Sequence, residues 1–204
     1  MTDSVGRPRA TRQYSEDRRQ ELLAATMSCL ARLGPRATTG REICRQAGVS
    51  HGLLRHYFAN PENLLLETYQ QLCDQSLARL EEELNSPSDN PWTTMERLFG
   101  VLFAEKWVNS DTMGAWIAFW NLVHCNQDFA QIQEAYRQKL LQLLDDALKH
   151  LPPNPGGLPR EQSVAILAAV IGGLWLDFSL RPNRLSRDRA LELCSQALQQ
   201  IAPA

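Results

Sequence analysis

The sequence has 204 residues, of which 44% are apolar and 22% charged, and its formal net charge is −2. This composition is ordinary for a globular chain with a sizeable core, and a net charge this small excludes any argument for a nucleic-acid partner from overall charge alone. The five cysteines are odd in number, scattered and without CxxC spacing, which favours free thiols in a reducing cytosol over a disulfide framework.

Positive charge is concentrated in the first 60 residues. They hold ten Arg and no Lys against five acidic residues, whereas the rest of the chain holds eleven Lys and Arg against eighteen acidic residues. Because Arg suits bidentate contacts to phosphate and guanine, this asymmetry predicts a basic head for a polyanion and an acidic body. Residues 1–14 are predicted to be a flexible basic arm, in which Arg7, Arg9 and Arg12 either enter a minor groove or stay in solvent.

Two helices are predicted after the arm. The first is capped by Ser15 and ends at Gly34-Pro35. The second is capped by Thr38 or Thr39, and Glu42 is placed to form a capping box with Thr39. Thr39 is in the first place a cap and in the second a candidate phosphate ligand.

The segment AGVSHGLLRHYF, residues 47–58, predicts the turn and last helix of a helix-turn-helix. Ala47 allows two helices to cross closely, Gly48 permits a left-handed turn, and Ser50 can cap a helix over residues 51–58. A tight corner between two core helices is the alternative. The residues that would contact DNA, either as base readers or through phosphate, are Thr39, Arg41, Ser50, His51, Gly52, Leu53, Arg55, His56 and Tyr57.

This region resembles the DNA-binding region of TetR-family transcriptional regulators over about residues 16–66. The residues that carry the resemblance are Thr38-Thr39, Ile43, AGVS at 47–50, Gly52, Leu54, Tyr57-Phe58, Glu62 and Leu64-Leu65. The resemblance implies a helix-turn-helix on a larger helical domain that binds a small molecule and dimerises, with repression relieved by that molecule. Two positions depart from the family: Arg55 stands where an aromatic is usual, and Pro61, where a Lys is usual, cannot contact phosphate through a charge.

Periodic apolar residues predict helices throughout the remaining chain. Asn60-Pro61 opens a fourth helix that runs to about residue 84, and SPSDNP at 86–91 is a linker. Further helices are predicted near 92–107, 111–125, 128–150, 160–181 and 186–201. No strand pattern of useful length is present, so the fold class is all-α, with a three-helix DNA-binding domain at 15–60 and a larger ligand-binding and dimerisation domain at 61–204.

Aromatic residues gather in two stretches of the body, AWIAFWNLVH and GGLWLDFSL. Indole faces attract quaternary ammonium ions, so these residues are either an aromatic box for a cation or ordinary core. Asp177 would add countercharge or pair with Arg181. The candidate ligand-binding residues are Trp107, Trp116, Phe119, Trp120, His124, Tyr136, Trp175 and Phe178. Both stretches resemble the BetI-type subfamily, repressors of the choline-to-glycine-betaine pathway, which implies choline or a relative as inducer; a neutral hydrophobic ligand is the alternative.

The last two predicted helices carry wide apolar surfaces, which predict a homodimer. The residues assigned to that contact are Ile171, Leu174, Leu191, Cys194 and Leu198. A two-fold dimer implies a palindromic operator in double-stranded DNA.

No pattern points to catalysis. The four His lack metal spacing, no Gly-rich phosphate loop is present, and no nucleophile stands beside a base, so we expect neither an enzyme nor a cofactor or metal. An architectural DNA binder without sequence preference is a further alternative. The N-terminus has no secretory signal and the apolar run at 164–176 is too short to span a membrane, which predicts a cytoplasmic protein without a membrane partner.

Overall fold

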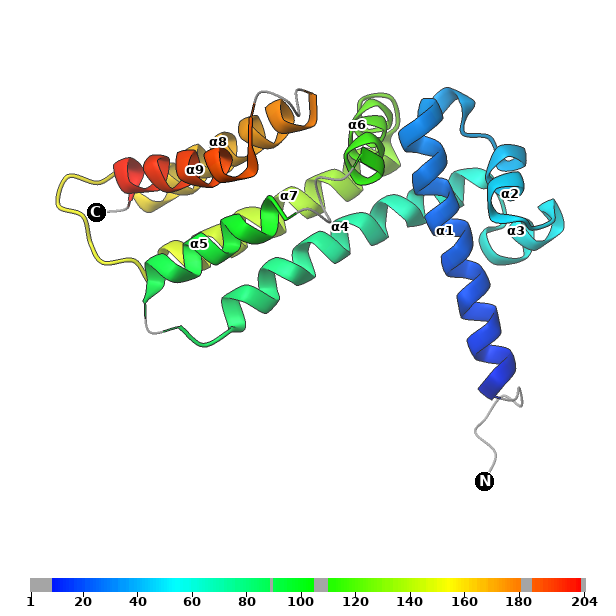
Figure 1. Cartoon of the computed structure of the whole chain (residues 1–204), viewed down its shortest axis with the longest axis horizontal. Helices are drawn as coiled ribbons and strands as arrows, with labels where there is room; N and C mark the ends of the chain where they lie inside the picture. Colours follow the sequence, from blue (N-terminus) through cyan, green and yellow to red (C-terminus); the bar gives the residue numbers. More distant parts are fainter. Residues whose placement is uncertain (1–8, 89, 105–109, 181–184, 203–204) are drawn as a thin grey trace.

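The computed structural model describes residues 9–88, 90–104, 110–180 and 185–202, and within them the chain forms α-helices without strands. Figure 1 shows α2 and α3 beside α1 at one end of the molecule and α8 and α9 at the other, with α4 and α7 running between the ends. The helices are α1 (Arg9–Ala37), α2 (Gly40–Ala47), α3 (His51–Phe58), α4 (Pro61–Asn85), α5 (Pro91–Leu102), α6 (Ser110–Cys125), α7 (Gln127–Leu148), α8 (Arg160–Leu180) and α9 (Arg187–Ile201). The all-α prediction is confirmed.

The first helix differs from its predicted start. α1 begins at Arg9, so Ser15 lies inside the helix rather than at its cap, and the predicted flexible arm is helical from residue 9 onward. Residues 1–8, including Arg7, lie outside the described part. Near the other end Gly34 leaves the helical conformation with φ 73°, which places a kink at the predicted break. The chain resumes one helical turn after the kink because Pro35 suits the first position of a helix.

The head is built on a small core of its own. Leu22, Leu23 and Cys29 of α1 are buried against Ile43 of α2 and Leu54 of α3. These positions follow helical spacing, so each short helix has one buried face and leaves its opposite face to solvent. α2 and α3 have eight residues each, which is too short for stability in isolation, and this packing is what holds them.

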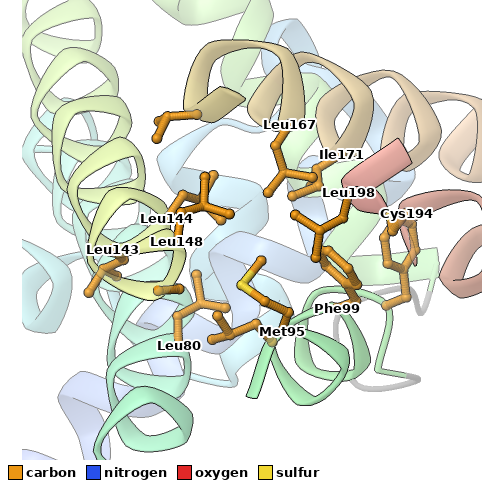
Figure 2. Close-up of a cluster of buried hydrophobic side chains, with 14 of the residues drawn as sticks. Leu80, Met95, Phe99, Leu143, Leu144, Leu148, Leu167, Ile171, Cys194 and Leu198 are labelled. Atoms are coloured by element: carbon orange, nitrogen blue, oxygen red, sulfur yellow. The ribbon is translucent and has the colours of Figure 1, made fainter. Parts of the chain in front are cut away.

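The larger core of the body joins five helices. In Figure 2 the labelled side chains of α4, α5, α7, α8 and α9 converge on one interior. Leu80, Phe99, Leu144, Leu167 and Leu198 are among its fully or almost fully buried members. α8 and α9 are thereby fixed to α5 and α7 by their inward faces.

A third cluster joins the head to the body. Leu30 of α1 is buried together with Tyr69 of α4 and Phe119 of α6. α1 and α6 cross closely because Gly114 has no side chain: a Cβ placed there would lie 2.9 Å from both Cα and Cβ of Ala31. α1 packs against both parts, and Leu64 of α4 belongs to the head core, so the division at residue 60 stays a prediction.

α8 is apolar on two faces. The sequence predicted an apolar run too short to span a membrane, but the segment Arg160–Phe178 has a mean hydropathy of 1.3 and is long enough to cross a membrane by length and composition alone. Its inward side chains, including Val164, Leu167 and Ile171, belong to the body core. The outward side chains Leu176 and Leu180 are exposed in the single chain.

Candidate nucleic-acid interface and inner cavity

The turn between α2 and α3 has the geometry that its sequence predicts. Gly48 adopts the left-handed conformation, with φ 65° and ψ 31°, and ends α2. The Ser50 hydroxyl then accepts a hydrogen bond from the backbone N–H of Leu53 at 3.2 Å and caps α3. Both predicted roles are confirmed, and together they fix the direction in which α3 leaves the turn.

The cap of α2 is simpler than predicted. Thr39 Oγ1 accepts from the backbone N–H of Glu42 at 3.3 Å, so Thr39 is the cap. The expected return bond from Glu42 is absent among the bonds of the described residues, because the Glu42 carboxylate accepts from Arg45 Nε at 3.0 Å. This hydrogen bond from Arg45 lowers the pKa of Glu42.

The outward faces of α2 and α3 form a basic surface, on which two guanidinium groups have no acidic partner among the described residues. Arg41 and Arg55 are exposed, and neither has an acidic partner in the described part of the chain. By contrast, Arg18 pairs with Glu21, and Arg45 pairs with Glu42. A guanidinium group with no internal partner is free to bind an external anion, so this surface fits a polyanion.

Two of the predicted DNA-contact residues, His51 and Tyr57, also pack against other residues of the head. The His51 ring lies beside Gly40 and Pro61, since a Cβ on Gly40 would lie 3.1 Å from His51 Nε2 and 2.7 Å from Pro61 Cγ. Tyr57 is half-buried, and its ring lies 6.4 Å from that of Phe58. Pro61 thus has a packing role that sequence reasoning missed, because the sequence drew attention only to the charge that it lacks.

Most of the remaining predicted DNA-contact residues are exposed to solvent. Thr39, Ser50, Gly52 and His56 are exposed, whereas Leu53 is half-buried. All nine candidates therefore lie on α2, α3 or their caps, and seven of them are exposed. Their contact with DNA stays a prediction.

A cavity of about 250 Å³ lies inside the body between α4, α5, α6, α7 and α8. Four of the eight predicted ligand residues line it: Trp116, Trp120, Tyr136 and Trp175. The Trp175 ring is 6.3 Å from that of Trp116 at 79° and 5.8 Å from that of Trp120 at 67°. Steeply inclined indole rings of this kind form the corner of a box rather than a flat stack.

The structure places three other candidates away from the cavity lining. Phe119 is fully buried and stacks on Tyr69 at 4.5 Å, because its position on α6 turns it from the Trp116–Trp120 stripe toward α4. Phe178 lies 6.4 Å from Phe103 in the body core, and His124 is exposed at the end of α6. Trp107 lies outside the described residues.

One wall of the cavity is polar, and of its residues the sequence analysis assigned only Tyr136 to ligand binding. Ser76 of α4 and Gln133, Tyr136 and Arg137 of α7 line this wall. The hydroxyl groups of Ser76 and Tyr136 are 3.4 Å apart, and Tyr69 donates a hydrogen bond to Gln133. Burial raises the pKa of Tyr136 to about 12, so the phenol is neutral at physiological pH.

Arg137 is the charged residue of the described lining. Among the described residues no Asp or Glu lines the cavity, and Asp177, the predicted countercharge, is exposed and not part of the lining. Arg137 has no acidic partner in the described part of the chain. The aromatic corner therefore faces a cavity with one fixed positive charge.

The residues assigned to dimerisation divide into two groups. Ile171, Cys194 and Leu198 are buried inside the subunit, so their assignment to an outer surface was wrong: they pack onto α5 and α7 of their own chain (Figure 2). Leu174 and Leu191 are half-buried at the edge of the same core. The large apolar side chains that α8 does expose are Ile166, Leu176 and Leu180.

Comparison with known proteins assigns a family to each part of the chain. Residues 22–68 match the model of bacterial regulatory proteins of the tetR family, and residues 91–203 match that of the BetI-type transcriptional repressor, C-terminal. The HTH-type transcriptional regulator BetI of Escherichia coli (strain K12) is 30% identical over 190 residues, which is 91% of this chain and 94% of the relative. The regulator of the same name from Vibrio campbellii is 28% identical over 179 residues, or 86% and 87% of the two chains.

Solved structures share the fold at lower identity. A transcriptional regulator from Rhodococcus sp. Rha1 is 22% identical with a TM-score of 0.77, covering 90% of this chain and 95% of its own. A regulator from Saccharomonospora viridis in complex with choline is 16% identical with a TM-score of 0.74, covering 90% of this chain and 96% of its own.

Proposed function

The chain belongs to the TetR family of bacterial transcriptional regulators, with a C-terminal region of the BetI type, and we propose that it is a cytoplasmic repressor whose dimer leaves a palindromic operator when a small quaternary ammonium compound binds. The main evidence for a quaternary ammonium ligand is that three indole rings, those of Trp116, Trp120 and Trp175, meet in the wall of one cavity. Indole faces bind quaternary ammonium ions through the negative face of the ring. Choline bound to the S. viridis regulator supports the same class.

The size of the cavity supports a small ligand. Its volume of about 250 Å³ lies just below the range of about 300–1,000 Å³ that is usual for drug-sized ligands. A compound with a trimethylammonium group and a short tail has a volume that such a cavity can hold. A large hydrophobic drug would require the helices around the cavity to move apart.

The exposed surface of α2 and α3 supports DNA binding by the head. α3 is capped and directed by Ser50, and Arg41 and Arg55 offer exposed guanidinium groups that have no acidic partner among the described residues. In a helix-turn-helix the second helix lies in the major groove with its first residues at the base edges, and neighbouring basic residues hold phosphate. We assign phosphate or guanine contacts to Arg41 and Arg55 on this basis.

The outward face of α8 supports dimerisation. Ile166, Gly173, Leu176 and Leu180 are exposed on it, and Gly173 has no atom within 4 Å of the Cβ it lacks. A small residue between exposed apolar side chains allows a second helix to approach closely. Two copies related by a two-fold axis would bury this face and present two heads to the two halves of a palindrome.

Release of DNA requires that the ligand favours a head spacing that does not fit the operator. Three contacts connect the cavity to the head. α6 carries Trp116 and Trp120 and crosses α1 at Gly114. Tyr69 of α4 stacks on Phe119 of α6, and Glu62 in the first turn of α4 accepts a hydrogen bond from Asn126 at 3.2 Å. A shift of α6 on ligand binding would therefore move both α1 and α4.

The operator and the ligand can be tested together. The operator is selected from random double-stranded DNA with the full-length protein and then titrated with choline. We expect binding to the selected DNA to weaken with choline in the wild type and to be unaffected by choline in Trp120→Ala. Trp92→Ala removes a half-buried indole outside the cavity lining and is the matched control, which should keep its response. Normal release in Trp120→Ala would refute the cavity assignment.

The DNA and dimer contacts need separate variants. Arg41→Ala and Arg55→Ala should each weaken operator binding and leave choline affinity unchanged, while Arg79→Ala, whose side chain pairs with Glu82 on α4, should change neither. Leu176→Glu should give a monomer in analytical ultracentrifugation. Its control is Ile117→Glu on α6, since Leu176 and Ile117 are 39% and 37% exposed. An intact dimer in Leu176→Glu would exclude the α8 face as the interface.

A further inference from the structure

We infer that the cavity selects a zwitterion, with a quaternary ammonium group held by the indole corner and a carboxylate held by Arg137. This inference rests on the proposed function, because it takes the aromatic corner to be the seat of a methylated ammonium group. It adds a second recognition element that a simple cation such as choline does not use. The ligand class is then a short N-methylated amino acid rather than an amino alcohol.

The two kinds of lining lie on different helices. Trp116 and Trp120 come from α6 and Trp175 from α8, whereas Ser76 comes from α4 and Arg137 from α7. A ligand in this cavity meets aromatic faces from α6 and α8 and hydrogen-bond donors from α4 and α7. A molecule with a cationic apolar end and an anionic polar end matches both walls at once.

The charges of the described lining disfavour a simple cation. Among the described residues that line the cavity Arg137 alone is charged, and it has no acidic partner in the part of the chain that the structure describes. A monocation would add a second positive charge to this space, and the two charges would repel each other. A zwitterion brings its own anion, which can form two parallel hydrogen bonds with the guanidinium group.

Arg137 is also placed where a carboxylate can reach it without full loss of water. It contributes to the cavity lining, yet the residue as a whole is exposed, so it stands where the cavity opens to solvent. The neighbouring Tyr136 phenol is within 3.4 Å of the Ser76 hydroxyl and is kept neutral by burial. These hydroxyl groups line the same cavity as Arg137 and can donate hydrogen bonds to an anionic group, and the described lining offers no competing carboxylate.

Four probes of nearly equal shape separate the two charges. Glycine betaine has both the ammonium and the carboxylate, and choline has the ammonium with a hydroxyl. 3,3-Dimethylbutyrate keeps the carboxylate but replaces the ammonium by a neutral quaternary carbon, and 3,3-dimethylbutan-1-ol has neither charge. Binding of each to the full-length protein is measured by isothermal titration calorimetry. We expect glycine betaine to bind at least tenfold more tightly than choline, and both to bind more tightly than their neutral-carbon counterparts.

The role of Arg137 is tested by Arg137→Gln, with Lys139→Gln as control. Lys139 lies two residues away on α7, pairs with Glu81 and is not part of the lining. Arg137→Gln should weaken glycine betaine at least tenfold and leave choline unchanged or tighter, and Lys139→Gln should change neither. Circular dichroism checks that both variants are folded. Because Arg137 is exposed, its loss is not expected to disturb the core.

The outcomes distinguish this inference from the proposed function. If choline binds as tightly as glycine betaine, or if Arg137→Gln weakens both ligands equally, the carboxylate assignment is overturned while the quaternary ammonium site stands. If each neutral-carbon probe binds as tightly as its ammonium counterpart, the proposed cation site fails. The carboxylate assignment then survives only if the loss in Arg137→Gln is confined to the two carboxylates.

Discussion

Replacing Gly114 by Ala tests whether the crossing of α1 and α6 is as close as the structure has it. The new Cβ would lie 2.9 Å from the Cα and Cβ of Ala31 and 3.1 Å from its carbonyl oxygen. Carbon atoms prefer separations of about 3.5–4.0 Å, so the two helices must move apart by roughly 0.6–1 Å. Rotation of a side chain cannot relieve this contact, because two of the three atoms belong to the backbone.

The magnitude follows from two opposing effects. Overpacking of this kind costs about 1–3 kcal/mol, while removing a glycine from a helix interior returns up to about 1 kcal/mol. Gly100 of α5 supplies the matched control, since a Cβ there meets only the Arg187 side chain at 3.8 Å. Gly100→Ala therefore keeps the helix gain without the clash, and the difference between the two variants measures the clash alone.

The assay is thermal and urea unfolding followed by circular dichroism, at one protein concentration because an oligomer would make stability depend on it. For a chain of this size 1 kcal/mol corresponds to about 2–4 °C, so Gly114→Ala should melt about 2–12 °C below Gly100→Ala. Equal melting temperatures, or a higher one for Gly114→Ala, would show that α1 and α6 are not in close contact.

Three further predictions concern caps, thiols and pH. Ser50→Ala removes the cap of α3 and should lower the free energy of unfolding by about 0.5–2 kcal/mol, which urea unfolding measures. Of the five cysteines only Cys125 is exposed, so Ellman's reagent at pH 8 should titrate one thiol rapidly in the native protein and none in Cys125→Ser. Burial acts to raise the pKa of Asp145, but hydrogen bonds from Lys149 and Arg160 outweigh it and lower the pKa below 3.8. The carboxylate thus stabilises the fold at neutral pH, and this is lost as pH falls through the lowered pKa. Asp145→Asn should cost at most about 1 kcal/mol at pH 7, and its gap from the wild type in urea unfolding should narrow below pH 4.

The sequence predicted several helix ends correctly because those ends carry strong local signals, although α5 ends at Leu102 and not near residue 107. Gly48 and Ser50 fix the end of α2 and the start of α3, and the predicted range 51–58 agrees with α3. Asn60-Pro61 likewise opens α4. The start of α1 was wrong because Ser15 has the chemistry of a cap, yet nothing in the residues before it breaks a helix from residue 9 onward.

The direction of side chains in the body was harder to predict. α6 and α8 are apolar on most of their surface, so spacing alone does not separate a residue that lines the cavity from one that fills the core. This is why Trp120 and Phe119 were grouped together although the structure places them on different sides. Arg137 and Gln133 were missed for the opposite reason, since polar residues on a long amphipathic helix are ordinarily in solvent.

In α2 and α3 the residues that pack the head differ from the residues that face solvent, and this affects how the protein can change over evolution. Ile43, Leu54 and Phe58 hold the two helices in the head, whereas Arg41 and Arg55 point outward and support none of that packing. Substitutions at the outward positions are therefore almost free of a folding penalty. If these helices read DNA as proposed, a few exposed replacements could change the target sequence while the packing of the body stays the same.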